Sequence, residues 1–156
     1  NNDASNNYPV IRYADVILMY AEALNQNGKT AEACKYLNMT RRRGFGYQTT
    51  ETSPVDLQTT DKAQFALMVE QERRVELAFE EHRFFDIRRW RLLDDPQEKA
   101  DYLKIEGMQI VKDDNDEPHY SKYTVENRVF DERMYLYPIP KSEILKAPGI
   151  TQNPGW

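Results

Sequence analysis

Apolar residues recur every three or four positions over the first part of the chain, which is the spacing of one face of a helix. Two such segments, residues 13–27 and 30–43, are joined by the short Gly28-Lys29 link. So short a link makes two helices antiparallel neighbours. The predicted core positions are Ala14, Ile17, Leu18, Ala21 and Leu24, then Ala33, Cys34, Leu37 and Thr40, with Thr30 expected to cap the second helix. The spacing is that of a tetratricopeptide-type hairpin, in which small Ala21 and Ala33 lie at the helix crossing.

The region after this hairpin predicts a loop and then two further helices. Residues 45–60 are rich in Thr, Ser and Pro and have no periodicity, so we expect a loop with an exposed tip. A third helix is expected from residue 60 or 61 to about residue 81, and a fourth from 84 to about 93, ending at Asp94-Asp95-Pro96. The segment 8–95 is therefore predicted to be the helical part of the chain.

Beyond residue 100 the pattern changes from helical spacing to short alternating runs. Residues 102–105 and 108–111 predict short strands, 113–118 an acidic turn, and 120–130 a further strand. The tail, residues 135–156, contains four prolines and predicts only a short helical turn at 142–145. We therefore expect one domain over 1–156, mainly α, with short strands and a tail wrapping over the helices in 100–156.

The third predicted helix places carboxylates on the face that should be apolar. Its stripe reads Phe65, Met68, Val69, Glu72, Glu76 and Phe79, and Glu80 follows four residues after Glu76. A carboxylate taken into a core must find a partner or become protonated. We predict an inward ion-pair network that docks one helix on another, formed by Glu72, Glu76, Glu80, Arg73, Arg83, Asp86 and Arg89, with Arg41, Arg42 and Arg43 as further partners. The alternative is a solvated charged face.

Composition limits the classes of function. The chain has 156 residues, a formal net charge of −5 and a single cysteine, Cys34. The negative charge argues against a nucleic-acid-binding protein. One cysteine excludes an internal disulfide, and no apolar run reaches the roughly 20 residues that a membrane helix needs. The chain begins at Asn1 without a signal peptide or lipid-attachment cysteine, so we expect it to be a fragment.

Motif spacing gives no catalytic, cofactor or metal site. Glu80-Glu81-His82 lacks the ligand spacing of zinc and di-iron proteins. In the acidic run 113–117, Pro118 replaces the glycine that an EF-hand turn requires. No Ser or Cys nucleophile with a base can be argued. A carboxylate-based glycosidase remains the least supported alternative, because sequence spacing cannot place two carboxylates across a cleft. Among the aromatic residues, Phe45 and Tyr47 on the predicted loop are the candidates for ligand contact.

Three stretches resemble the C-terminal region of the SusD/RagB family. The first is Arg12 to Asn25, reading RYADVILMYAEALN, and the second is Glu72 to Trp90, reading ERRVELAFEEHRFFDIRRW. The third is the pair of tail motifs YPIPKSEI (137–144) and QNPGW (152–156). All three occur in the family's order and with similar spacing. Glu81 departs from the pattern, because a glycine is common at that position.

The resemblance implies a fold and a function. Members of this family are surface nutrient-binding lipoproteins, about three times this length, so the chain resembles their last third. The implied fold is a scaffold of tetratricopeptide-like hairpins with loops and short strands. The implied function is non-catalytic binding of oligosaccharides or peptides, delivered to a SusC-like TonB-dependent transporter, at the outer membrane and anchored by lipid in the missing N-terminal part. No ligand residue can be carried over. A helical protein-interaction scaffold without small-ligand binding is the alternative.

Overall fold

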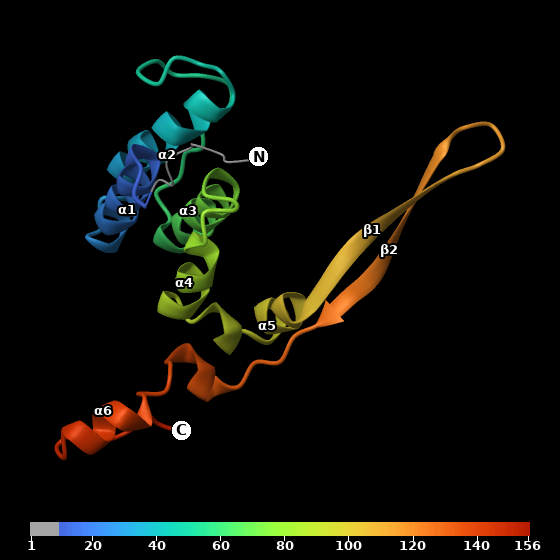
Figure 1. The fold of residues 1–156 in the computed structure, drawn as a ribbon. Coiled ribbons are helices and arrows are strands. Elements are labelled where there is room, and N and C mark those ends of the chain that lie inside the picture. Colours follow the sequence, from blue (N-terminus) through green and yellow to red (C-terminus); the bar gives the residue numbers. More distant parts are fainter. Residues whose placement is uncertain (1–9) are drawn as a thin grey trace, which may run out of the picture. The chain divides into compact units, whose positions relative to one another are not determined.

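The computed structural model describes residues 10–156, which form two compact units divided between Phe85 and Asp86. The first unit contains α1 (Tyr13–Gln26), α2 (Thr30–Gly44) and α3 (Lys62–Glu76), and α4 (His82–Arg89) crosses the division. The second contains η1 (Leu92–Asp94), α5 (Pro96–Leu103), β1 (Lys104–Lys112), β2 (Pro118–Asn127), η2 (Glu132–Tyr135) and α6 (Lys141–Lys146) (Figure 1). The predicted mainly α fold with a small β part is confirmed. Within the described residues, none of the helices has the length and apolar character needed to cross a bilayer.

α1 and α2 form the predicted antiparallel hairpin (Figure 1). Gly28 turns the chain with φ +76°, a left-handed conformation that glycine adopts without steric cost. Ala21 and Ala33 are fully buried, so the two backbones can approach closely. Thr30 does not cap α2, because the N-cap position is Lys29. Its hydroxyl instead donates to Asn25 Oδ1 of α1 over 2.8 Å, which ties the two helices together at the turn.

α3 completes the core of the first unit by burying Phe65 and Val69 against the hairpin. Asp61 caps it, accepting a hydrogen bond from the backbone N–H of Gln64. The helix ends at Glu76, five residues earlier than predicted, because Phe79 and Glu81 adopt left-handed backbone with φ 65° and 64°. Phe79, expected on the apolar face, is fully exposed as a result.

The second unit begins with helices that the sequence prediction misplaced. The sequence predicted one helix over 84–93. In the structure, α4 ends at Arg89, and α5, which was not predicted, comes after it in the chain. The side chain of Asp95 caps α5 by accepting from the backbone N–H groups of Gln97 and Glu98, and Pro96 is its first residue. Proline is well suited to this position, where its missing N–H costs no hydrogen bond.

β1 and β2 form an antiparallel hairpin around the acidic turn, with Ile110 opposite Tyr120 and a bulge at Ile105/Glu106. Residues 104–105 and 108–111 of the two predicted short strands thus belong to one strand, whereas 102 and 103 are the end of α5, and the predicted strand 120–130 ends at Asn127. In the tail, the indole N–H of Trp156 donates to the carbonyl oxygens of Arg133 and Leu136, each at 3.0 Å. The C-terminal residues are thereby held against η2.

Candidate functional site

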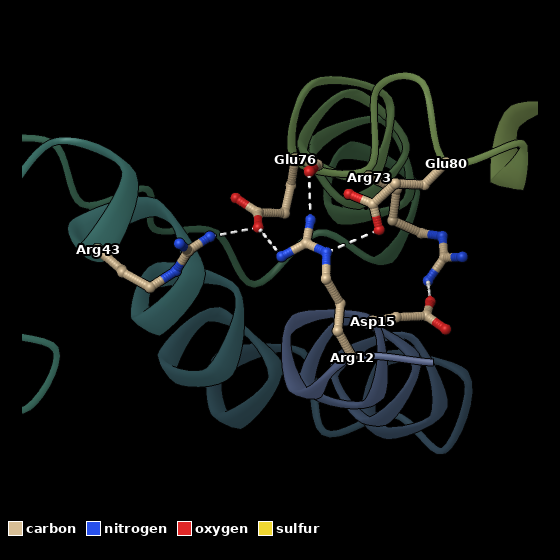
Figure 2. Close-up of polar contacts among 6 residues, drawn as sticks. All are labelled: Arg12, Asp15, Arg43, Arg73, Glu76 and Glu80. Carbon is tan, nitrogen blue, oxygen red and sulfur yellow. Dashed lines mark hydrogen bonds and ion pairs between the residues drawn. The ribbon is translucent and has the colours of Figure 1, made fainter. Parts of the chain in front are cut away.

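Glu76, the last residue of α3, accepts hydrogen bonds from two arginines, one just before α1 and one near the end of α2. Arg12 Nη1 lies 2.6 Å from Glu76 Oε1, and Arg43 of α2 pairs with the same oxygen. Arg12 also donates through Nη2 to the backbone carbonyl of Glu76 and through Nε to Glu80 Oε2 at 2.7 Å (Figure 2). One guanidinium therefore fixes both the end of α3 and the turn that follows it.

These contacts change the acidity of the groups involved. The hydrogen bond from Arg12 lowers the pKa of Glu80, and the two carboxylates raise the pKa of Arg12. Glu72 pairs with a different arginine, with Arg41 Nη1 3.2 Å from its Oε2. Burial nevertheless raises the pKa of Glu72, because loss of hydration outweighs the attraction of Arg41.

The other predicted members of the network also form ion pairs. Arg73 of α3 donates to Asp15 of α1 over 2.7 Å (Figure 2). Arg83 pairs with Glu70, and Arg89 pairs with Asp86 in the second unit, each over 2.8 Å. The structure thus brings Glu72, Glu76 and Glu80 to arginines of the first two helical segments, and each of the other four predicted residues has an ion-pair partner.

Arg12 and Asp15 were not predicted to belong to this site. Asp15 had a sequence signal, because it is the one acidic residue in the first turn of a helix whose following residues are mainly apolar. Its 4% exposure puts it among the core residues. Arg12 lies just before the first helical residue, outside any periodic segment, so spacing alone does not identify its partners.

The loop between α2 and α3 is held along α2 by polar side chains of that helix. Arg42 pairs with both carboxylate oxygens of Asp56, at 2.7 and 2.5 Å, and lowers the pKa of Asp56 to about 2. Asn38 donates to the carbonyl of Leu57 and accepts from its N–H, both at 2.9 Å. Arg41 Nε donates to the carbonyl of Val55 at 2.6 Å. The loop is therefore an ordered segment, although its sequence has no periodicity.

Phe45 and Tyr47 lie where this loop leaves α2. Their exposed fractions are 60% and 45%, and the Arg41 guanidinium lies 5.3 Å from the centre of the Phe45 ring. The backbone N–H of Tyr47 donates to the carbonyl of Arg42 at 2.8 Å. Both rings are therefore exposed to solvent, and a hydrogen bond to α2 fixes the backbone beside them.

Two cavities border α2. One of about 520 Å³ lies between α2 and the loop and is lined by Lys35, Asn38, Arg42, Asp56 and Thr59, among others. The other, of about 400 Å³, lies between the start of α1 and the end of α2 and is lined by Arg12, Tyr13, Thr40, Arg43 and Thr49, among others. Within residues 10–156, no group of three His, Cys, Asp or Glu residues is arranged to hold a metal ion.

Comparison with known proteins gives consistent matches. The family model described as the SusD family matches residues 1–156. SusD-like protein P2 of Formosa agariphila is 30% identical over 161 residues, covering 99% of this chain and 27% of that protein. SusD-like protein P25 of the same organism is 39% identical over 98 residues, covering 63% of this chain and 18% of that protein.

A solved structure matches the fold as well. The crystal structure of a SusD-like protein from Bacteroides fragilis superposes with a TM-score of 0.75 at 30% identity, covering 96% of this chain and 26% of that one. The chain therefore spans about a quarter of the length of the relatives that it matches from end to end.

Proposed function

Because this chain belongs to the SusD family, we propose that it forms part of a cell-surface protein that binds oligosaccharides or peptides as nutrients and does not turn them over. The observation that carries this proposal is the match of the chain to one family along its whole length. The two cavities along α2 support it, because their volumes of about 520 and 400 Å³ suit small polar ligands.

The finer part of the proposal concerns location and partner. The whole protein resides at the outer membrane, held by a lipid anchor outside this chain, and passes its ligand to a SusC-like TonB-dependent transporter. Family membership supports this assignment.

Within this chain, we assign Phe45 and Tyr47 to contact with the ligand. The exposure of both rings supports this role, since aromatic faces stack on sugar rings and on peptide side chains. We assign the ion pairs of Glu72, Glu76, Glu80 and Arg73 to holding α3 against the α1–α2 hairpin. Their largely buried carboxylates support a structural role, because such groups are difficult for a ligand to reach.

Calorimetric titration of the protein with a panel of glycans and peptides tests the proposal. Binding of one ligand class without release of product is the expected result. Binding of nothing in a broad panel would contradict ligand binding, and hydrolysis of a bound glycan would indicate a carboxylate-based glycosidase instead. Substituting both aromatic residues, as Phe45→Ala and Tyr47→Ala, should weaken the affinity, whereas Tyr123→Ala on β2, an equally exposed aromatic change, should not.

Co-purification with the transporter from a native membrane tests the partner separately. Recovery of the transporter together with ligand binding is expected. Recovery of a protein partner without any ligand affinity would favour the interaction-scaffold function, which the α1–α2 hairpin could provide.

A further inference from the structure

Arg41 lies beside Phe45, one of the two aromatic residues assigned to ligand contact, and two other segments of the chain hold it there. Its guanidinium carbon lies over the Phe45 ring, 5.3 Å from the ring centre, which is within the range of a cation–π contact. Its Nε donates to the carbonyl oxygen of Val55 in the loop at 2.6 Å, and its Nη1 lies 3.2 Å from Oε2 of Glu72 on α3. One side chain therefore joins the loop, α3 and an exposed aromatic ring.

The backbone that carries Phe45 is fixed by hydrogen bonds of its own. The backbone N–H groups of residues 45–47 donate to carbonyl oxygens in the last turn of α2, at 2.8 to 3.1 Å. Gly46 has a φ of +79°, so the chain leaves α2 through the glycine turn that commonly ends a helix. The remaining freedom of Phe45 lies in its side-chain torsions. A contact that holds the ring therefore decides which way it faces.

The guanidinium of Arg41 is restrained by segments outside α2. Val55 and Glu72 lie 14 and 31 residues away from it in sequence, and the Glu72 side chain is only 11% exposed. A planar guanidinium can use its edge for such hydrogen bonds while its face lies against an aromatic ring, which a lysine ammonium cannot do. One face of the Phe45 ring is therefore occupied by a restrained cation, and the opposite face is left for a ligand.

Resting on the proposed nutrient-binding function, we propose that Arg41 is a positioning residue for the Phe45 ring, and that Val55 and Glu72 hold its guanidinium where this role requires it. A ring that is already oriented loses less side-chain freedom when a ligand stacks on it, and that lost freedom is part of the cost of binding. The ligand meets the ring face opposite to Arg41. Its affinity therefore depends on a residue that acts only through Phe45.

Proton NMR of the full chain tests the contact without any ligand. The ring current of Phe45 should shift the δ protons of the Arg41 side chain upfield. Phe45→Leu, which keeps an apolar side chain without a ring, should remove this shift, and Glu72→Ala, which releases one nitrogen of the guanidinium, should reduce it. Arg41 δ protons that show no such shift would overturn the proposal, whatever the protein binds.

Calorimetric titration tests the effect on binding, with maltotetraose, laminaritetraose, xylotetraose and tetra-alanine among the glycan and peptide probes. Arg41→Lys keeps a positive charge for Glu72, so circular dichroism should show a folded chain. This variant should bind the recognised probe roughly two- to fivefold more weakly, the cost of ordering one side chain. The matched change Arg74→Lys, at an exposed position of α3, should leave the affinity unchanged.

A double-mutant cycle separates positioning of the ring from a general structural effect. Because Arg41 acts through the ring, Arg41→Lys should have no further effect on affinity in a Phe45→Ala background. Equal weakening in both backgrounds, or unaltered affinity in the single variant, would overturn the proposal and leave nutrient binding standing. Absence of binding to every glycan and peptide would overturn the proposed function and, with it, this role of Arg41.

Discussion

Arg73 of α3 donates a hydrogen bond to Asp15 of α1 over 2.7 Å, and the two side chains are only 4% and 6% exposed. By contrast, Arg12 and Arg43, which share Glu76, keep 27% and 54% of their side-chain surface in contact with solvent. Removing one partner is most costly where the remaining charge cannot reach water. The contact between α1 and α3 therefore depends more on Asp15 than on any exposed pair.

Asp15→Ala should lower the free energy of unfolding by about 3–5 kcal/mol, because it removes the carboxylate that faces a buried guanidinium. Urea unfolding followed by circular dichroism measures this change. Asp114→Ala in the exposed acidic turn is the control and should stay within about 0.5 kcal/mol of the parent chain. A cost below about 1 kcal/mol for Asp15→Ala would show that the pair contributes little.

Glu76→Ala should cost less, about 1–2 kcal/mol, although this carboxylate contacts two arginines. Both guanidiniums can be rehydrated when Glu76 is removed, and Arg12 keeps Glu80. The same urea experiment compares the two variants directly. A loss of unfolding free energy equal to that of Asp15→Ala would mean that the Arg12 guanidinium stays buried and is not rehydrated when Glu76 is removed.

Glu81→Gly should stabilise the chain by about 0.5–1 kcal/mol, because Glu81 has left-handed backbone, which is costly for any residue with a Cβ. Glu98→Gly within α5 provides a control of opposite sign and should cost up to about 1 kcal/mol. A loss of stability in Glu81→Gly would mean that the side chain itself makes a favourable interaction.

The Arg42–Asp56 pair should make stability depend on pH in acid. The pKa of Asp56 falls from 3.8 to about 2 on folding, so ionised Asp56 stabilises the fold above the unfolded value and loses this contribution as the pH falls through about 2. Asp56→Asn should therefore be less stable than the parent chain near neutral pH. The difference should shrink between about pH 4 and pH 2 in thermal unfolding scans. A difference that is constant with pH would contradict the lowered pKa.

Periodicity located the α1–α2 hairpin almost to the residue, since Tyr13–Gln26 and Thr30–Gly44 were expected at 13–27 and 30–43. Local spacing decides these helices, because their apolar faces pack on each other across a glycine turn. The end of α3 was missed because Phe79 continues the helical stripe in sequence, while its backbone is left-handed in the structure. α5 was missed because Asp95-Pro96 was interpreted as a stop, although the same dipeptide is a favourable start.

The site was less predictable than the fold. Acidic residues on an apolar face indicated that arginines would be needed, and Glu72 and Glu76 lie beside Arg41 and Arg43. Arg12 and Asp15 are separated in sequence from the residues that they contact by 58 positions or more. Which long-range partners meet is decided by how α1 and α3 pack, and helical spacing carries no information about that.

The α2 side chains that hold the loop bind its backbone more often than its side chains. Asn38 contacts both polar backbone groups of Leu57, Arg41 contacts the carbonyl of Val55, and Arg42 contacts that of Thr49. A backbone group is present whichever amino acid occupies the position. Substitutions can therefore accumulate in this loop without altering its path, so related proteins can diversify the surface that they present here while inheriting the same support.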